Sequence, residues 1–231
     1  MIKPQKKVAI FDIDGTIFRS SLLIELTDAF IQAGIFPVKA ARIFEESRKK
    51  WLDRQGSYEE YIEAVIQAFR LNIKGVRYKD FAKIAKKVID FHGNRTYRYT
   101  RDLVNQLKNK KYYLLAISHS PQKIVKEFCL RMGFNKVYGQ LYEIDEHNKF
   151  TGEILHLDLI LDKSKILQRA VNKENLTLKH SVGVGDTESD ISFLKQVAKP
   201  ICFNPNRKLY NYAKRKHWSI IVERKDVIYH F

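Results

Sequence analysis

Two aspartates, Asp12 and Asp14, follow directly after the apolar run Val8 to Phe11. The run is typical of a buried strand, and Gly15 permits the chain to turn just after the acids. One carboxylate of such a pair can attack phosphorus while the other handles a proton, provided that their surroundings separate their pKa values. A calcium loop fits poorly, because its glycine would come two residues later and no bidentate glutamate follows at the required spacing. An acidic turn without a catalytic role stays an alternative for this segment taken alone.

A second candidate segment surrounds Ser118. This serine directly follows the apolar run Tyr112 to Ile117, and a hydroxyl beside the amides that open a helix suits a phosphate oxygen. Ser118 or Ser120 could equally cap the following helix. His119, between them, has the setting of a loop histidine rather than of a catalyst. The segment by itself therefore leaves a phosphate-binding role open.

The third and fourth candidates lie later in the chain. Lys163 opens a predicted helix, but alone it is indistinguishable from a surface lysine, and Lys165 is a close alternative. From Gly185 to Asp190 an apolar strand runs into Gly-Asp, and a second aspartate follows four residues later. Oxygen ligands on such a turn suit Mg²⁺. The segment lacks the third glycine of a dinucleotide fingerprint and the Gly-Lys-Ser/Thr of a P-loop.

The hydrophobic pattern predicts the elements that position these residues. From about Leu22 to Phe91 apolar residues recur at helical spacing, with breaks near residues 34–37, 55–57 and 72–75, which predicts about four helices and no strand. Beyond residue 94 predicted helices and strands alternate, as is typical of a parallel, doubly wound sheet. Polar residues at the carboxyl ends of such strands gather in one crevice.

The individual elements lead to a fold class. Predicted strands cover residues 8–11, 112–117, 181–184, 200–203 and 218–222, with a hairpin over 137–155. Predicted helices cover 101–110, 121–132 with Pro121 at the first helical position, 164–171 and 191–197. We therefore expect an α/β fold: a Rossmann-like, doubly wound, mainly parallel sheet with an inserted all-helical cap. The core would comprise residues 1–18 and 95–231, and the cap residues 19–94.

The four segments, taken in order and with their spacing, resemble the four successive motifs of haloacid dehalogenase-type hydrolases. The resemblance spans nearly the whole chain. The helical insertion between the first two motifs is similar to that of subfamily IB, the phosphoserine phosphatase-like group. The resemblance implies Mg²⁺-dependent hydrolysis of a small phosphomonoester through an aspartyl-phosphate intermediate. Transfer of the phosphoryl group to an alcohol other than water is the alternative reaction.

The resemblance also implies catalytic and metal-binding roles. Asp12 would be the nucleophile and a magnesium ligand. Asp14 would protonate the leaving group, then activate water, and would bind magnesium through its backbone carbonyl. Asp186 would be a further magnesium ligand, and Asp190 would support the metal site.

Four more positions are implied to bind the phosphoryl group. Ser118 would hold one of its oxygens, and Lys163 would stabilise both the nucleophile and the phosphoryl charge. Gly15 and Thr16 would complete the phosphate site. The implied partner is a small phosphorylated metabolite.

The predicted cap departs from the phosphoserine phosphatase pattern. Those enzymes carry a glutamate near the start of the cap that pairs with the substrate amine, and this chain has Ser21 there. No arginine can be placed for the substrate carboxylate, because Val65 or Ala68 falls nearest and Arg70 lies beyond. Phosphoserine is therefore not the expected substrate.

The predicted cap is also rich in arginine and aromatic residues. We hypothesise that some of them face the cleft and favour a bulkier or more anionic leaving group; the alternative is that they coat the solvent face. The residues concerned are Arg42, Arg48, Arg54, Arg70, Trp51, Tyr58 and Tyr61.

Composition limits the remaining possibilities. The net charge of +16 is compatible with a basic nucleic-acid-binding protein on a catalytically silent scaffold. The basic residues are spread through most segments, however, which favours a solvated surface over a nucleic-acid partner. No apolar run is long enough to span a membrane and no signal peptide is recognisable, so we expect a cytoplasmic protein. Cys129 and Cys202 have neither metal nor disulfide spacing and are expected to be buried thiols. The oligomeric state is not indicated.

Overall fold

Strand β1 (Lys6–Phe11) lies in the middle of an eight-stranded sheet in the computed structural model, which describes residues 4–231. Its two neighbours are β2 (Tyr113–Pro121) and β5 (Leu176–Gly185), both parallel to it. The other strands are β3 (Lys136–Ile144), β4 (Phe150–Leu155), β6 (Lys199–Phe203), β7 (Ser219–Arg224) and β8 (Val227–His230). The order is β4-β3-β2-β1-β5-β6-β7-β8, and the two edge strands β4 and β8 are antiparallel to their neighbours.

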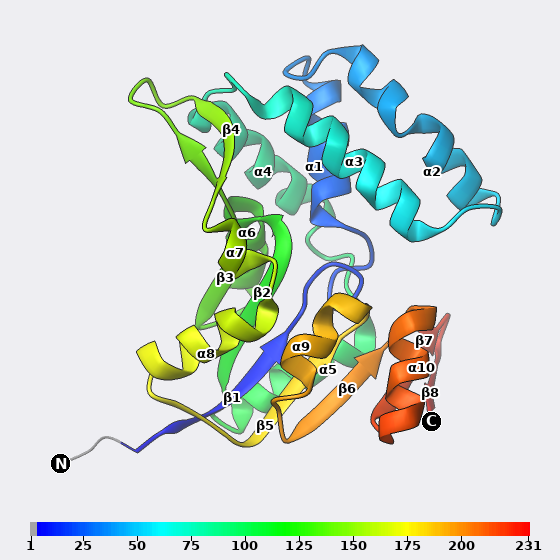
Figure 1. Cartoon of the computed structure of the whole chain (residues 1–231), viewed down its shortest axis with the longest axis vertical. Coiled ribbons are helices and arrows are strands. Elements are labelled where there is room, and N and C mark those ends of the chain that lie inside the picture. Colours follow the sequence, from blue (N-terminus) through cyan, green and yellow to red (C-terminus); the bar gives the residue numbers. More distant parts are fainter. Residues whose placement is uncertain (1–3) are drawn as a thin grey trace.

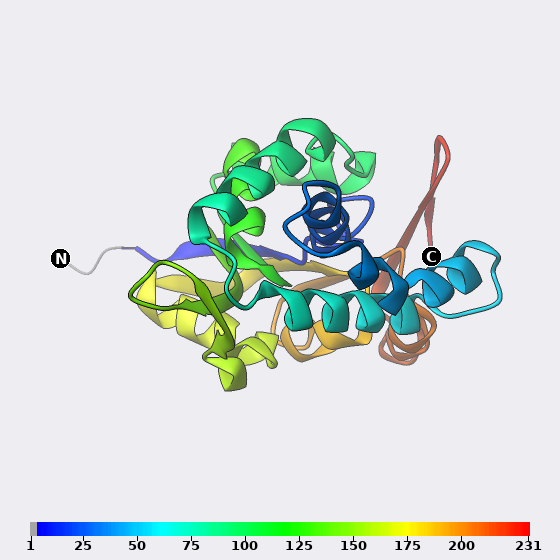
Figure 2. The same ribbon diagram turned by 90° about the horizontal axis from the view of Figure 1, so that it is seen from above.

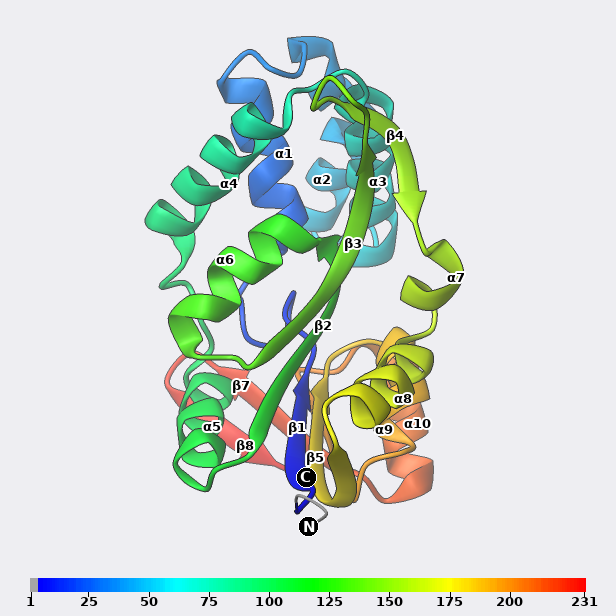
Figure 3. The ribbon, with the colours of Figure 1, turned by 90° about the vertical axis from the view of Figure 1, so that its left-hand side faces the viewer.

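Helices cover both faces of this sheet (Figure 3). Helices α5 (Arg98–Asn109) and α6 (Gln122–Met132) lie on one face. Helices α8 (Lys163–Lys173), α9 (Ile191–Leu194) and α10 (Arg207–Lys216) lie on the other. The short helices α7 (Leu157–Ile160) and η2 (Glu188–Asp190) complete this part.

Strand β1 shows why both faces must be covered. Its side chains alternate, so that Ala9 and Phe11 belong to one hydrophobic cluster while Val8 and Ile10 belong to the other. All four are fully buried. A strand with no polar position in its last four residues is stable only between two helical layers, and this explains its place in the centre of the sheet.

Residues 22–92, called the helical segment below, lie above one end of the sheet (Figures 1 and 2). The segment contains α1 (Leu22–Gln32), η1 (Val38–Ile43), α2 (Glu45–Leu52), α3 (Tyr58–Ile73) and α4 (Tyr78–His92). Serine hydroxyls cap two of these helices, because Ser21 accepts a hydrogen bond from Leu23 N–H and Ser57 accepts one from Glu60 N–H. An aromatic core joins them, with Phe30 stacked on Phe36 at a ring-centre separation of 4.7 Å.

The β3–β4 hairpin is bonded to the helical segment (Figure 1). Gly75 N–H donates to Phe150 O at 2.8 Å, and Phe150 N–H donates to Val76 O at 3.0 Å. Tyr78 N–H donates to Asn148 O at 2.8 Å. The loop between α3 and α4 is thus held against the hairpin by main-chain hydrogen bonds that need no particular side chain.

The expected fold class is confirmed, and so are four α-helices without a strand in the segment 22–91. Both cysteines are buried, as expected. Some details were wrong. Pro121 is not the first helical residue but precedes α6 in an extended conformation, and α5 begins at Arg98 rather than at residue 101. Helix α10 and strand β8 were not predicted. No helix within residues 4–231 is long and apolar enough to cross a membrane.

Candidate active site

The predicted chemistry-bearing residues meet at the carboxyl ends of β1, β2 and β5. Phe11 is in register with Ala116 of β2 and with Val184 of β5. The next residue, Asp12, donates its N–H to Val184 O at 2.9 Å. The chain leaves β1 toward β2 and β3 on one side and later returns to add β5, β6 and β7 on the other. The site is therefore the crevice at the switch point, where ligands bind in open α/β sheets.

Lys163 joins two of the predicted acids. Its Nζ lies 2.6 Å from Asp12 Oδ1 and 2.6 Å from Asp190 Oδ1, and its side chain is 2% exposed. Burial opposes the charge of the lysine, but the two carboxylates outweigh this effect and raise the pKa of Lys163 above its ordinary value. Lys165, the alternative in the sequence, is exposed. Of the two lysines, only Lys163 reaches the acids.

Burial and the ion pair with Lys163 act on the pKa of Asp12 in opposite directions. Burial raises the pKa of its carboxyl to about 7, Lys163 opposes this rise, and the charges of Asp190 and Asp14 add to it. The carboxylate is 7% exposed. It is thus an anion that the protein alone does not fully stabilise, which is the property of a site prepared for a cation.

Asp14 is held by both of its oxygens. Oδ1 accepts the backbone N–H of Leu22 at 2.5 Å, and Oδ2 accepts the hydroxyl of Ser118 at 2.6 Å. Ser118 in turn accepts the N–H of Ser120 at 2.9 Å. Helix α6 begins only at Gln122 and has Pro121 at its N-cap, with no side-chain capping hydrogen bond. Neither Ser118 nor Ser120 therefore caps that helix, and the capping alternative is wrong. Asp14 consequently bridges β2 and the first turn of α1.

Three carboxylates are close enough to share one cation. Asp12, Asp186 and Asp190 each offer an oxygen, and these oxygens lie within 4.8 Å of one another. Burial and the neighbouring charges of Asp12 and Asp190 raise the pKa of Asp186 well above its ordinary value. One lysine opposes three carboxylates here, and hard oxygen donors are those that Mg²⁺ prefers. The residues present therefore fit a magnesium ion.

Within this group, Asp190 differs from the other two carboxylates. Its Oδ2 accepts the N–H groups of Asp186 (2.9 Å) and Thr187 (3.1 Å), while its Oδ1 holds Lys163. Both of its oxygens are thus already engaged within the protein. Thr16, predicted to bind phosphate, is buried and donates its hydroxyl to Asp186 Oδ1 at 3.2 Å.

Two glycines permit this close approach. Gly15 has φ +79°, and a Cβ there would lie 2.1 Å from Asp186 Oδ2. At Gly185 a Cβ would lie 2.5 Å from the Asp190 side chain. Any other residue at these positions would push the carboxylates apart. Position 15 thus requires glycine for a structural reason that is independent of its predicted role in the phosphate site.

A cavity of about 180 Å³ opens over these groups. The side formed at the end of the sheet, called the sheet side below, contains Asp12, Asp14, Lys163 and Asp186. The opposite side contains Ser21, which caps α1, and four residues of the helical segment, Leu23, Tyr58, Ile62 and Ile66. Of the arginine and aromatic residues hypothesised to face the cleft, Tyr58 lines this cavity. The four arginines do not line it; they are Arg42, Arg48, Arg54 and Arg70. The hypothesis of a more anionic leaving group loses its basis.

Sequence reasoning missed part of this lining. Ile62 and Ile66 lie one helical turn apart on α3, beside the stripe of Tyr61 and Val65 that packs into the core. A helix with apolar residues on two faces has a second contact surface, which is the signal that could have revealed them. His119 also lines the cavity. Burial and the charge of Lys163 lower the pKa of its ring to about 4.

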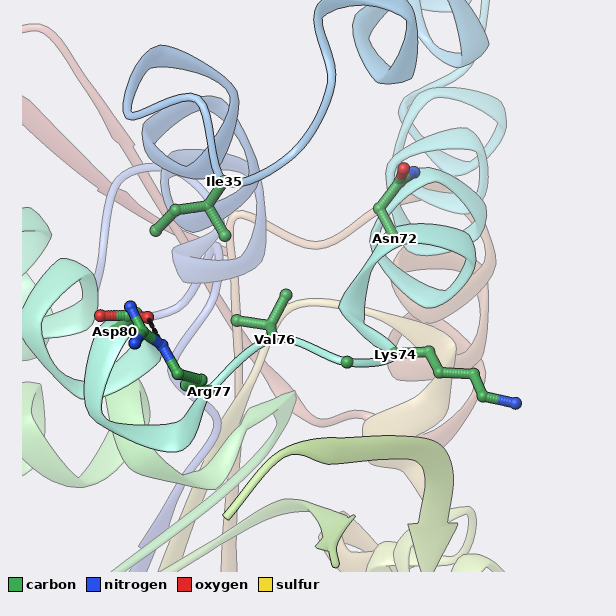
Figure 4. Close-up of a pocket in the computed structure, with 7 residues that line it drawn as sticks. Ile35, Asn72, Lys74, Val76, Arg77 and Asp80 are labelled. Carbon is green, nitrogen blue, oxygen red and sulfur yellow. Dashed lines mark hydrogen bonds and ion pairs between the residues drawn. The ribbon is translucent and has the colours of Figure 1, made fainter. Parts of the chain in front are cut away.

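A second hollow, of about 320 Å³, lies elsewhere, around the loop between α3 and α4 (Figure 4). Its lining includes Ile35, Asn72, Lys74 and an ion pair between Arg77 and Asp80, whose Nε and Oδ2 are 2.6 Å apart. None of the residues predicted to carry chemistry lies in it. The larger hollow is therefore not the reactive site.

Comparison with known proteins gives the family. Residues 9–195 match the model of the haloacid dehalogenase-like hydrolases. A phosphoserine phosphatase of Methanocaldococcus jannaschii is 21% identical over 98% of this chain and 96% of its own. A histidinol-phosphatase of Neisseria meningitidis is 24% identical over 94% of this chain and 98% of its own.

A solved structure of similar shape is that of a Bordetella pertussis protein of unknown function. It has a TM-score of 0.74 at 16% identity and covers 94% of this chain and 98% of its own. The likeness extends over the sheet and the helical segment together. With the family match and the geometry of the crevice, the chain belongs to the haloacid dehalogenase-like hydrolases, as a phosphatase-type enzyme of their phosphoserine phosphatase-like group.

Proposed function

We propose that the protein is a Mg²⁺-dependent phosphomonoester hydrolase that acts through an aspartyl-phosphate at Asp12, on a small metabolite other than phosphoserine. The observation that carries the proposal is the position of Asp12. Its carboxylate is paired with the buried Lys163 at 2.6 Å and shares a cluster with Asp186 and Asp190. A nucleophile, a fixed cation and oxygen ligands are thereby gathered in one crevice.

The first step forms the covalent intermediate. An oxygen of Asp12 attacks phosphorus, the bond between phosphorus and the ester oxygen breaks, and the electron pair leaves with the alcohol oxygen. Asp14 in its protonated form gives its proton to that oxygen. Ser118, which here donates to Asp14, turns its hydroxyl to a phosphoryl oxygen, and Lys163 offsets the charge that develops.

The second step releases phosphate. Asp14, now a carboxylate, takes a proton from water as the water oxygen attacks phosphorus. The bond between phosphorus and Asp12 breaks, which restores the carboxylate and frees inorganic phosphate. Asp14 ends protonated, as it began, so the net reaction is hydrolysis of the ester to an alcohol and phosphate.

Magnesium would be held by Asp12, Asp186 and the backbone carbonyl of Asp14, with Asp190 in support. When bound, it supplies positive charge that allows an anionic nucleophile to approach a phosphate dianion. The excess of carboxylates over cations around Lys163 supports this assignment.

We further propose that the helical segment is a cap that selects the alcohol, with boundaries near residues 19 and 94. The main chain pairs where it leaves and returns, since Arg19 N–H donates to Arg95 O at 2.8 Å and Tyr97 N–H donates to Ile17 O at 3.0 Å. Ser21 lines the cavity, and a neutral hydroxyl does not offset the desolvation of a substrate ammonium, which costs several kcal/mol when unpaired. This argues against phosphoserine.

The test is phosphate release from p-nitrophenyl phosphate by the full chain. Turnover should require Mg²⁺, vanish with excess EDTA and return when Mg²⁺ is restored in excess of the chelator. Unchanged turnover in the chelated sample would refute the metal-dependent mechanism. Absence of turnover under every metal condition would refute the phosphatase proposal itself.

A further inference from the structure

The two sides of the active-site cavity differ in charge. Within residues 4–231, the ionisable acids and the lysine that line it, Asp12, Asp14, Lys163 and Asp186, all come from the sheet side. The opposite side consists of Ser21, which caps α1, together with a tyrosine and three aliphatic side chains of the helical segment. The latter are Leu23 of α1 and Ile62 and Ile66 of α3. The alcohol part of a substrate, which must point away from the nucleophile, therefore meets an uncharged wall.

Two arginines of the helical segment have partners outside the cavity lining. Arg48 lies 3.6 Å from Asp28, and Arg54 lies over the ring of Trp51 at 6.0 Å. The charges on the sheet side are also bound to one another, through Lys163 with Asp12 and Asp190. Within the described lining Lys163 is the only lysine or arginine, so a carboxylate or a second phosphate on the alcohol would enter without a free partner. An ammonium on the alcohol would find no carboxylate on the helical side of the lining.

Tyr58 adds a polar hydroxyl group to this wall, besides that of Ser21. Tyr58 is partly buried, and burial together with the charges of Asp14 and Asp186 raises the pKa of the hydroxyl above its ordinary value. The hydroxyl stays protonated and neutral at any ordinary pH. It can donate one hydrogen bond to an ester or phosphoryl oxygen, and it carries no charge that would attract a charged alcohol.

The size of the cavity limits the alcohol. At about 180 Å³ it is smaller than the roughly 300–1,000 Å³ typical of drug-sized ligands. A dry cavity of about 150 Å³ lined by aliphatic side chains accommodates a guest the size of benzene. Room for a phosphoryl group together with a short chain of a few carbons is what the cavity offers.

We infer that the site takes phosphomonoesters of short, apolar alcohols whose carbon chain packs against Leu23, Ile62 and Ile66. This inference rests on the proposed hydrolase function and names its substrate class. The apolar wall removes the carbon chain from water, while the sheet side binds the phosphoryl group that all phosphomonoesters share. Selection would thus come from what the wall excludes.

The experiment compares kcat/KM of the full chain with Mg²⁺ for n-butyl phosphate, phosphoethanolamine, glycerol 3-phosphate and O-phosphoserine. Butyl phosphate should exceed each polar or charged ester by about tenfold or more, since a few methylenes in an apolar pocket are worth that much. Equal or better turnover of phosphoserine or phosphoethanolamine would overturn the inference and leave the hydrolase function standing. No turnover of any ester, p-nitrophenyl phosphate included, would overturn both.

Variants of α3 make the test independent of total activity. Ile66→Asp places a carboxylate on the wall and should shift the ratio of phosphoethanolamine to butyl phosphate turnover by about tenfold toward the amine. Ile62→Ser should reduce the preference for butyl phosphate without favouring the amine. Leu71→Asp is the matched control, because Leu71 lies on the same helix, is 65% exposed and does not line the cavity. A ratio of substrates within one preparation is unaffected by the fraction that folds. Unchanged ratios in both wall variants would refute the role of the wall.

Discussion

The sheet side and the helical side of one cavity are built on opposite principles. On the sheet side, Asp12, Lys163 and Asp190 are buried, charged and joined by contacts of 2.6 Å. On the helical side, Ile62 and Ile66 are uncharged and only partly buried. A fixed set of buried ion pairs can perform the same chemical step on any phosphate ester. A wall of aliphatic side chains can change without disturbing it, so the difference separates chemistry from selection.

One contact crosses between the two sides within the reactive centre. The N–H of Leu22, in the first turn of α1, donates to Asp14 Oδ1 at 2.5 Å. The proposed acid and base therefore depends on the position of the helical segment, whereas Asp12 does not. If the segment moves away, Asp14 loses a donor while the pair of Asp12 and Lys163 remains.

The largest effect that we predict is a loss of turnover when Asp12, on the sheet side, is replaced. Asp12→Asn should lower turnover of p-nitrophenyl phosphate by about a thousandfold or more, because the proposed nucleophile is removed. The variant should still fold, with an unchanged or higher Tm without metal, since a buried charge is deleted from a cluster with excess negative charge. Activity and thermal unfolding measured on the same sample check both statements. A variant that retains a tenth of wild-type turnover would contradict the role of Asp12.

This contrast also shows what the sequence could predict. The acids of the first and last segments follow apolar strands, and parallel strands end at one edge of the sheet, so the meeting of Asp12, Asp14 and Asp186 was predictable. The choice between Lys163 and Lys165 was not. It depends on a contact with Asp12 that spans 151 residues of chain, and no local pattern encodes such a contact.

The elements that the sequence did not predict also depend on features that no local pattern encodes. Helix α10 is largely basic and has only two buried residues, Leu209 and Ala213, so the sequence offers few apolar positions from which to predict it. Strand β8 is an edge strand with mostly exposed side chains that pairs with β7 alone. The sequence left open which arginine and aromatic residues of the helical segment face the cleft, and only Tyr58 of that set lines the described cavity. Which face a residue occupies depends on packing between helices far apart in the chain.

A smaller predicted effect is a pH dependence of the protein's stability, which arises from the buried acids of the sheet side and not from the uncharged helical side. Burial raises the pKa of Asp12 to about 7 and that of Asp186 well above its ordinary value. Between about pH 4 and pH 7 the folded, metal-free protein therefore binds more protons than the unfolded chain, and its stability falls as pH rises. Mg²⁺ binds the deprotonated carboxylates, so its stabilising effect should grow as pH rises.

Thermal unfolding with and without saturating Mg²⁺ measures this effect. We expect a rise in Tm of about 4 °C or more at pH 8 and about 1 °C or less at pH 5. Asp186→Asn should abolish the rise at pH 8, and Asp53→Asn, an exposed position on the helical side, should leave it intact. An equal rise at both pH values would show that the buried acids are not the site of the metal.

The smallest predicted effect concerns an ionic contact at the rim, where the two sides touch. Lys208 of α10 lies 2.7 Å from Glu188 Oε1 beside the acidic cluster and 3.1 Å from Glu59 Oε2 on α3. Glu59 follows Tyr58, so this contact holds the wall over the reactive groups. All three side chains are partly exposed, and exposed ion pairs are weak and screened by salt.

Lys208→Gln should therefore raise KM for n-butyl phosphate by about fivefold at most at low ionic strength, with little change in kcat. The difference from the wild type should disappear at about 1 M salt, where screening acts within a few ångströms. Lys214→Gln on the same helix, with no acidic partner among the described ion pairs, is the control. A large loss of kcat in Lys208→Gln would mean that the rim takes part in the chemistry, and would end the separation between a reactive sheet side and a selective helical side.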